Sequence, residues 1–206
     1  MASIDKMEAF LIASITEQKE KEQSANIWAE SDWKDVATLE NNNVGLVGEN
    51  FVRMLCAEAG ILADIDGSKT KQIGGGAGDG TIKTRTVEIK TARQGTSGTS
   101  FQHELGEKPW LASFMMFVDI SPKEFYLTVF PNFTEDEYKS STKCPRVFPT
   151  KSITWRKKSG AFKLDTTVAI NRQKSIDQGD TFRWSPDTSI ESFKAFIDRI
   201  IPNVAE

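Results

Sequence analysis

The spacing of apolar and polar residues predicts three helices in this chain of 206 residues. Residues 4–23 repeat apolar side chains every three or four positions before a run of lysines and glutamates, which is typical of an amphipathic helix. Residues 45–59 repeat the same pattern. The last helix is expected over 188–201, where Thr188 and Glu191 have the spacing of a capping box.

The helix over 45–59 is expected to face the core with one apolar stripe, made of Val47, Phe51, Met54 and Leu55. A second face of this helix carries Glu49, Val52 and Cys56. Gly45 and Gly48 are costly inside a helix, so they indicate that another part of the chain packs closely against its first turns.

Four segments have the pattern of strands: 61–66, 84–92, 112–120 and 124–130. The second of these alternates, so Glu88 and Lys90 are expected on one face of the strand and Val87 and Ile89 on the other. The third is almost entirely apolar, which is typical of a central strand that is covered on both faces. Only a short break separates the third segment from the fourth, which predicts a hairpin.

Residues 152–167 predict two further strands joined by a basic turn, and residues 101–110 predict a short helix or turn. The sequence shows no internal repeat and no boundary of a second domain. We therefore expect one α/β domain, with an N-terminal helical region over about 1–43, a core over about 44–130 and a C-terminal hairpin and helix over about 131–206.

The net charge of −3 does not by itself indicate a polyanionic partner, but the charges are unevenly distributed. Residues 67–94 contain six basic and two acidic side chains, and residues 138–164 contain eight basic and no acidic side chains. This distribution fits a protein with one basic face, and it fits two solvated charged segments equally well.

Histidine and cysteine are rare in this chain, which limits the kinds of catalytic and metal-binding site that it can form. His103 is the only histidine, which excludes sites built from several imidazoles. Cys56 and Cys144 are the only cysteines and lie far apart, which predicts two free thiols in a cytoplasmic protein and argues against a structural zinc site.

No apolar run approaches the roughly 20 residues that a membrane-spanning helix needs.

A glycine-rich loop precedes two carboxylates and a lysine. Asp79 lies at the exit of this loop, and the strand that follows places Glu88 and Lys90 on one face. Two converging carboxylates can hold Mg²⁺ through hard oxygen ligands, and a lysine beside them can orient or deprotonate water. Glu49, on the preceding helix, can turn toward the same ion. These groups suit the hydrolysis of a phosphodiester bond.

The same residues also have plain structural interpretations. Glu88 and Lys90 fit a surface ion pair of little energetic worth. Asp79 is followed by glycine, and this dipeptide favours turns. Glu49 fits a solvated position on its helix.

The order of a helix with Glu49, a strand, Asp79 and a strand with Glu88 and Lys90 resembles the PD-(D/E)XK nuclease superfamily, which includes most type II restriction endonucleases. The resemblance covers about residues 44–130. It implies a restriction-endonuclease-like core, with a mixed central β-sheet flanked by helices. It also implies that Asp79 and Glu88 bind Mg²⁺, that Lys90 assists the attacking water, and that Glu49 has a weaker role near the metal.

Two comparisons limit the resemblance. The proline that precedes the aspartate in the family motif is replaced by Gly78, a substitution that the superfamily tolerates. An exonuclease-type subgroup carries a glutamine followed four positions later by a tyrosine. Gln102 is followed at that distance by Gly106, so this subgroup is not supported.

The resemblance implies a Mg²⁺-dependent endonuclease that cuts double-stranded DNA, in particular a type II site-specific restriction endonuclease. Such an enzyme is expected to act as a homodimer alongside a cognate DNA methyltransferase. A DNA-repair or junction-resolving nuclease of the same fold, and a catalytically inactive DNA-binding module, are the alternatives. The side chains expected to contact DNA are Lys69, Lys71, Arg93, Gln102, Arg156, Lys157 and Lys158. The sequence assigns no role to His103.

Overall fold

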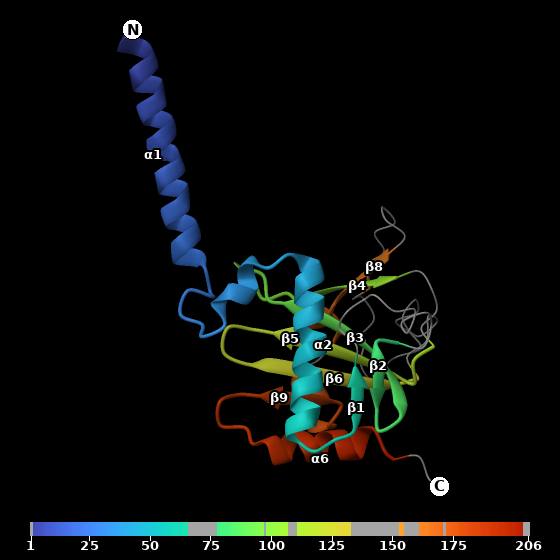
Figure 1. The fold of residues 1–206 in the computed structure, drawn as a ribbon. Coiled ribbons are helices and arrows are strands. Elements are labelled where there is room, and N and C mark those ends of the chain that lie inside the picture. The colour runs from blue at the N-terminus through green and yellow to red at the C-terminus, as the bar shows by residue number, and fades with distance from the viewer. Residues whose placement is uncertain are drawn as a thin grey trace.

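The computed structural model describes residues 2–65, 78–96, 98–106, 111–132, 153–154, 161–170 and 172–203. The chain forms a mixed α/β fold, in which a six-stranded mixed sheet is flanked by helices (Figure 1). The α/β class expected from the sequence is therefore confirmed. No helix in the described ranges has the length and apolar character that crossing a membrane requires.

The first helix, α1 (Ala2–Ala25), extends away from the rest of the molecule (Figure 1). It confirms the helix predicted over 4–23, and large apolar side chains on it are exposed, among them Phe10 at 70%. Trp28 follows and is buried, and its Nε1–H donates to the carbonyl of Gln94 at 3.1 Å. The chain therefore joins the body of the protein at Trp28.

The main sheet has the strand order β1-β2-β3-β5-β6-β9. Its strands are β1 (Ala63–Ile65), β2 (Gly80–Ile82), β3 (Arg85–Arg93), β5 (Phe114–Ile120), β6 (Phe125–Pro131) and β9 (Thr181–Trp184). β3 and β5 are parallel, and every other neighbouring pair is antiparallel. The four predicted strands and the hairpin of β5 with β6 are confirmed. The sequence did not predict β2 and β9, because three or four residues are too few to establish a period.

Two helices, α2 (Asn41–Glu58) and α6 (Ile190–Ile200), pack on one face of the main sheet. A short 3₁₀ helix, η1 (Lys34–Thr38), precedes α2. The core of buried side chains lies between these helices and the sheet, and includes Val52, Val118 and Phe193.

The stripe expected to face the core on α2 is partly wrong. Val47 and Met54 are exposed, and the buried face instead carries Glu49, Val52 and Cys56. The reason is the close approach that Gly48 permits, since a Cβ at that position would lie 1.8 Å from Thr91 Oγ1 on β3. That approach turns the glycine side of the helix inward. A Cβ at Gly45 would meet nothing within 4 Å, so only one of the two glycines marks the contact.

The N-terminus of α6 also differs from the prediction. Ser189 caps the helix, and its Oγ accepts a hydrogen bond from Ser192 N at 3.2 Å. Thr188 instead accepts a hydrogen bond from Ser185 N at 3.0 Å, so it belongs to the turn before the helix. A serine and a threonine side by side offer two possible caps, and the turn at Ser185 decides between them.

A second sheet, with the order β4-β8-β7, covers the opposite face of the main sheet. Its strands are β4 (Gln102–Gly106), β8 (Ala161–Asp165) and β7 (Ile153–Thr154). Pairing of β7 with β8 confirms the two predicted C-terminal strands. The helix or turn predicted over 101–110 is wrong at β4, where His103 and Leu105 are buried and Gln102 and Glu104 are exposed. Two short helices, α4 (Thr166–Ala169) and α5 (Arg172–Asp177), follow β8.

Candidate functional site

Asp79 is fixed against the edge of β3. β2 pairs only with residues 85–87 of β3, and Asp79 continues along the same edge. Its backbone N–H donates to the carbonyl of Val87 at 2.8 Å, and its Oδ2 accepts from the backbone N–H of Ile89 at 2.7 Å. The carboxylate is therefore held on the backbone on either side of Glu88, and its charge acts on the Glu88 carboxyl.

Gly78 allows this arrangement. Its φ is +94°, and a Cβ at this position would lie 2.3 Å from the carbonyl oxygen of Val87. Proline fixes φ near about −65°, so it cannot adopt this backbone conformation. Glycine at position 78 is thus required by the way in which Asp79 docks on β3.

Glu88 and Lys90 form an ion pair on one face of β3. Lys90 Nζ donates a hydrogen bond to Glu88 Oε1. The Lys90 side chain is 25% exposed and the Glu88 side chain is 13% exposed. The structural interpretation as a well-solvated surface pair therefore does not fit. The register with β5 places Glu88 beside Met115 and Lys90 beside Phe117, and both of these neighbours are buried.

The carboxylate of Glu88 is electrostatically strained. Burial raises the pKa of Glu88, Lys90 acts to lower it, and the negative charge of Asp79 raises it again, with a net increase. A carboxylate that is buried next to another carboxylate gains from a nearby cation. Lys90 supplies one positive charge to two acidic groups.

Lys90 is held in its charged form. Burial acts to lower the pKa of Lys90, but the carboxylates of Glu88, Asp79 and Glu49 together outweigh burial, so the pKa is raised. Lys90 is therefore an ammonium donor at neutral pH and is poorly suited to remove a proton from water. The same balance shows that Glu49 acts on this cluster.

A cleft of about 640 Å³ opens between the first half of α2, the edge of β3 and β4. The side chains or backbone of Glu49, Asp79 and Lys90 line it. Glu88 does not itself line the cleft, but its side chain is bonded to Lys90, which does. Glu49 is 5% exposed and reaches the cleft from the helical face of the sheet, because Gly48 brings α2 close to β3.

The donor set fits a hard divalent cation. The described residues contain no group of three or more His, Cys, Asp or Glu side chains arranged to hold a metal ion. Mg²⁺ does not require one, since it commonly uses one or two carboxylates and completes its shell with water and substrate phosphate. Asp79 and Glu88 provide two such carboxylates, and the pKa of Glu88 is raised chiefly by burial and further by the charge of Asp79.

The residues expected to contact DNA divide into two groups. Arg93 and Gln102 line the cleft, and Arg93 Nη1 donates to the carbonyl of Leu39 at 2.6 Å, which fixes its position. Gln102 is exposed on β4. The other candidates lie outside the described residues: Lys69, Lys71, Arg156, Lys157 and Lys158.

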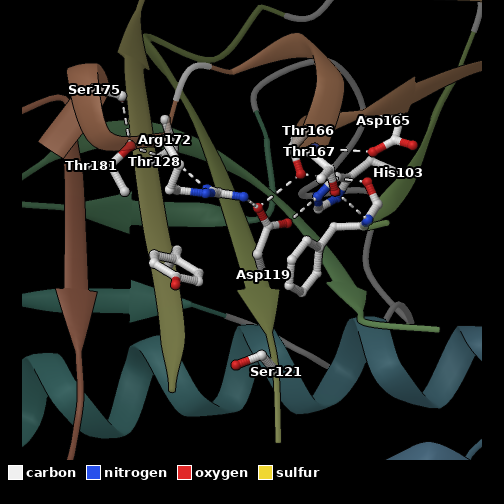
Figure 2. Close-up of polar contacts among 12 residues, drawn as sticks. His103, Asp119, Ser121, Thr128, Asp165, Thr166, Thr167, Arg172, Ser175 and Thr181 are labelled. Carbon is white, nitrogen blue, oxygen red and sulfur yellow. Dashed lines mark hydrogen bonds and ion pairs between the residues drawn. The ribbon is translucent and has the colours of Figure 1, made fainter. Parts of the chain in front are cut away.

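The sequence did not reveal a second polar cluster, centred on Asp119 of β5. Asp119 is fully buried, and Figure 2 shows it between Arg172 on one side and His103 and Thr166 on the other. Oδ1 lies 2.6 Å from His103 Nε2, while Oδ2 accepts from Thr166 Oγ1 at 2.8 Å and from Arg172 Nη2. A single aspartate in an otherwise apolar strand, together with a single histidine, was the signal available in the sequence.

These partners keep Asp119 ionised. Burial alone acts to raise the pKa of Asp119, but His103, Arg172 and Thr166 outweigh burial and lower it. Arg172 also stacks over the ring of Tyr126, with 4.4 Å between the guanidinium carbon and the ring centroid. Because the carboxylate can only accept, His103 Nε2 is the donor in their hydrogen bond.

Comparison with family models, with curated proteins and with solved structures finds no match for this chain.

Proposed function

We propose that this protein is a Mg²⁺-dependent endonuclease that hydrolyses phosphodiester bonds of double-stranded DNA, and that it acts as a type II site-specific restriction endonuclease. The observation that carries the proposal is the position of Asp79. Its carboxylate is bonded to the Ile89 amide, beside the Glu88–Lys90 pair, in the wall of a cleft. A restriction-endonuclease-like core is part of the same proposal.

Each residue of the cluster would have a separate role in the hydrolysis. Asp79 and Glu88 are the groups that would hold Mg²⁺, with Glu49 as a further carboxylate. When bound, the ion supplies positive charge that polarises water and offsets the charge on the phosphate. The Lys90 ammonium, kept protonated by its acidic neighbours, orients the attacking water and stabilises the negative charge that develops on the phosphate oxygens.

Partners follow from the same proposal. A two-fold symmetric DNA target is cut on both strands by two copies of a single-site enzyme, so we propose a homodimer. A nuclease that cuts specific sites also requires protection of the host's own sites, so we propose a cognate DNA methyltransferase in the same system.

Cleavage of DNA tests the proposal directly. Purified protein is incubated with plasmid DNA and Mg²⁺, with and without EDTA, alongside Glu88→Ala and Lys90→Ala. Discrete fragments that require Mg²⁺ and disappear in both variants are expected. Glu104→Ala removes another carboxylate that lines the cleft, on an exposed position of β4, and serves as a matched control that keeps activity.

Other outcomes separate the alternatives. Cutting that is confined to branched or mismatched substrates favours a repair or junction-resolving nuclease. A smear of products indicates a nuclease without site specificity. Binding of DNA without cutting, unchanged in both variants, favours a catalytically inactive DNA-binding module and overturns the proposed enzyme.

A further inference from the structure

The N-terminal helix α1 carries large apolar side chains that the described part of the chain leaves uncovered. Phe10, Leu11, Ile12 and Ile15 are between 46% and 70% exposed. No described helix or strand packs along the length of α1, which projects from the body of the protein (Figure 1). Helices in proteins gain most of their stability by packing an apolar face, so an uncovered helix of 24 residues indicates a binding partner.

Three of these side chains form one stripe on the helix. At about 3.6 residues per turn, Leu11, Ile12 and Ile15 lie within about 100° of one another around the helix axis, and Phe10 borders the stripe. The stripe lies near the middle of the helix Ala2–Ala25. A two-fold axis through the stripe therefore brings the same side chains of two copies together, with helix on both sides of the contact.

The size of this apolar surface fits a dimer. At their present exposure the four side chains offer roughly 100 Å² each, so a symmetric pair can bury roughly 800 Å² of apolar surface. Because homodimer interfaces are about 65% apolar, this corresponds to about 1,200 Å² in total. That area is at the lower end of the range for stable interfaces, so we expect a reversible dimer.

The charges of α1 favour a second copy of the chain over a polyanion or an anionic membrane. Residues 17–21 contain two glutamates and two lysines, and Glu17 pairs with Lys21 at 2.7 Å within the helix. These residues therefore carry no net charge that would repel an identical copy. Helices that lie on membranes instead concentrate lysine and arginine on their polar face.

The segment that follows α1 is bonded to the wall of the cleft. Ile27 N donates to the carbonyl of Thr96 at 3.2 Å, and Trp28 Nε1–H donates to the carbonyl of Gln94 at 3.1 Å. Gln94 and Thr96 both line the cleft. A contact between two α1 helices therefore joins two clefts through short segments that are hydrogen-bonded to the cleft walls.

We infer that α1 is a dimerisation helix, and that the partner which covers Leu11, Ile12 and Ile15 is α1 of a second copy of this chain. Formation of this dimer does not depend on the chemistry in the cleft. The use of the dimer, which is to bring two clefts to the two strands of one DNA duplex, rests on the proposed function.

Sedimentation equilibrium of the full-length chain tests the inference. The wild type is expected to dimerise reversibly at micromolar concentrations. Leu11→Glu is expected to weaken the dimer by about 30-fold or more, the loss typical of a side chain at the centre of an interface. Met54→Glu is the matched control and should dimerise like the wild type, since Leu11 and Met54 are both 62% exposed and both lie on helices.

A second measurement on the wild type does not depend on the folding of any variant. In a dimer, the backbone amides of residues 9–21 should exchange with solvent more slowly as the protein concentration rises through the range of dimerisation. Exchange that does not change with concentration overturns the inference, as does a wild type that stays monomeric at high micromolar concentration.

The variants separate the remaining outcomes. A dimer that folded Leu11→Glu leaves intact, or that Met54→Glu weakens equally, overturns the assignment of the interface to α1. A monomeric wild type that binds vesicles of anionic phospholipid, with Leu11→Glu unable to bind, identifies α1 as a membrane-binding helix and also overturns it.

DNA cleavage distinguishes this inference from the proposed function. A wild-type dimer that is weakened by Leu11→Glu but does not cut DNA with Mg²⁺ overturns the proposed function and leaves the dimerisation helix standing. Where the wild type cuts, Leu11→Glu should accumulate nicked plasmid in place of fragments cut on both strands. Cutting of both strands at the wild-type rate by monomeric Leu11→Glu overturns the use of the dimer.

Discussion

Two clusters of charged side chains lie on the same face of the main sheet, and they are balanced in opposite ways. Asp79, Glu88 and Lys90 combine two carboxylates with one ammonium, and the pKa of Glu88 is raised. Asp119 has His103, Arg172 and Thr166 as partners, and its pKa is lowered. The first cluster has more negative than positive charge, whereas the second already satisfies its carboxylate.

The difference indicates what each cluster contributes. A carboxylate whose hydrogen bonds are complete stabilises the fold and fixes the orientation of its partners, as Asp119 does for the imidazole of His103. A carboxylate that is buried with insufficient positive charge lowers stability and favours ligand binding. Loss of Asp119 should therefore affect folding first, and loss of Glu88 should affect the response to cations first.

The largest effect is expected from Asp119→Ala, because this change leaves the Arg172 guanidinium and His103 without their buried acceptor. Breaking a buried ion pair by removing one partner costs about 3–5 kcal/mol in the free energy of unfolding. Urea denaturation followed by circular dichroism measures this loss. Arg183→Ala is the control, since it breaks an arginine–carboxylate pair with Glu124 in which Arg183 is 55% exposed, and about 0–1 kcal/mol is expected. Equal losses in the two variants would contradict the contrast between buried and exposed pairs.

An intermediate loss of stability is expected when the contact between Gly48 and Thr91 is disrupted, because this contact brings Glu49 to the first cluster. Gly48→Ala places a methyl group where Thr91 Oγ1 now lies, at 1.8 Å from the new Cβ, so α2 must move away from β3. We expect a loss of about 1–3 kcal/mol in the free energy of unfolding, which thermal denaturation measures.

Gly45→Ala is the matched control for that change. It lies one turn earlier on the same helix and would meet nothing within 4 Å, so alanine should stabilise the helix by up to about 1 kcal/mol. The same sign of effect at both glycines would show that α2 does not approach β3 through Gly48.

The sequence predicted the first cluster better than the second for a physical reason. Glu88 and Lys90 are two residues apart on one strand, so local alternation alone places them together. Asp79 required only the return of a short loop to the same strand. The Asp119 cluster joins side chains from β4, β5, α4 and α5, and no local period connects residues 16 to 53 positions apart.

The errors in the fold that was predicted from the sequence have the same origin. Apolar spacing on α2 identified a stripe with Val47 and Met54, whereas the side that faces the sheet is defined by Gly48, whose role depends on Thr91 across the interface. The segment of β4 contains only five strand residues, and its alternation is brief. Tertiary contacts, rather than local pattern, decide such short or glycine-containing elements.

The smallest effect, and the one that separates the two clusters most directly, concerns pH. Because the folded pKa of Glu88 is raised, its contribution is stabilising at low pH and is lost as pH rises through that pKa. Asp119 has a lowered folded pKa, so its contribution is present at neutral pH and is lost as pH falls through that pKa. Glu88→Gln should therefore gain stability relative to the wild type as pH rises from acidic to neutral, in the presence of EDTA.

Mg²⁺ should reverse this gain. A cation that binds only the folded wild type raises its stability in proportion to the logarithm of its concentration, once Glu88 is ionised. Melting curves of wild type and Glu88→Gln at acidic and neutral pH, each with EDTA or with millimolar Mg²⁺, measure both effects. Parallel melting temperatures under all four conditions would mean that Glu88 carries no uncompensated charge, and the comparison between the clusters would then reduce to a difference in burial alone.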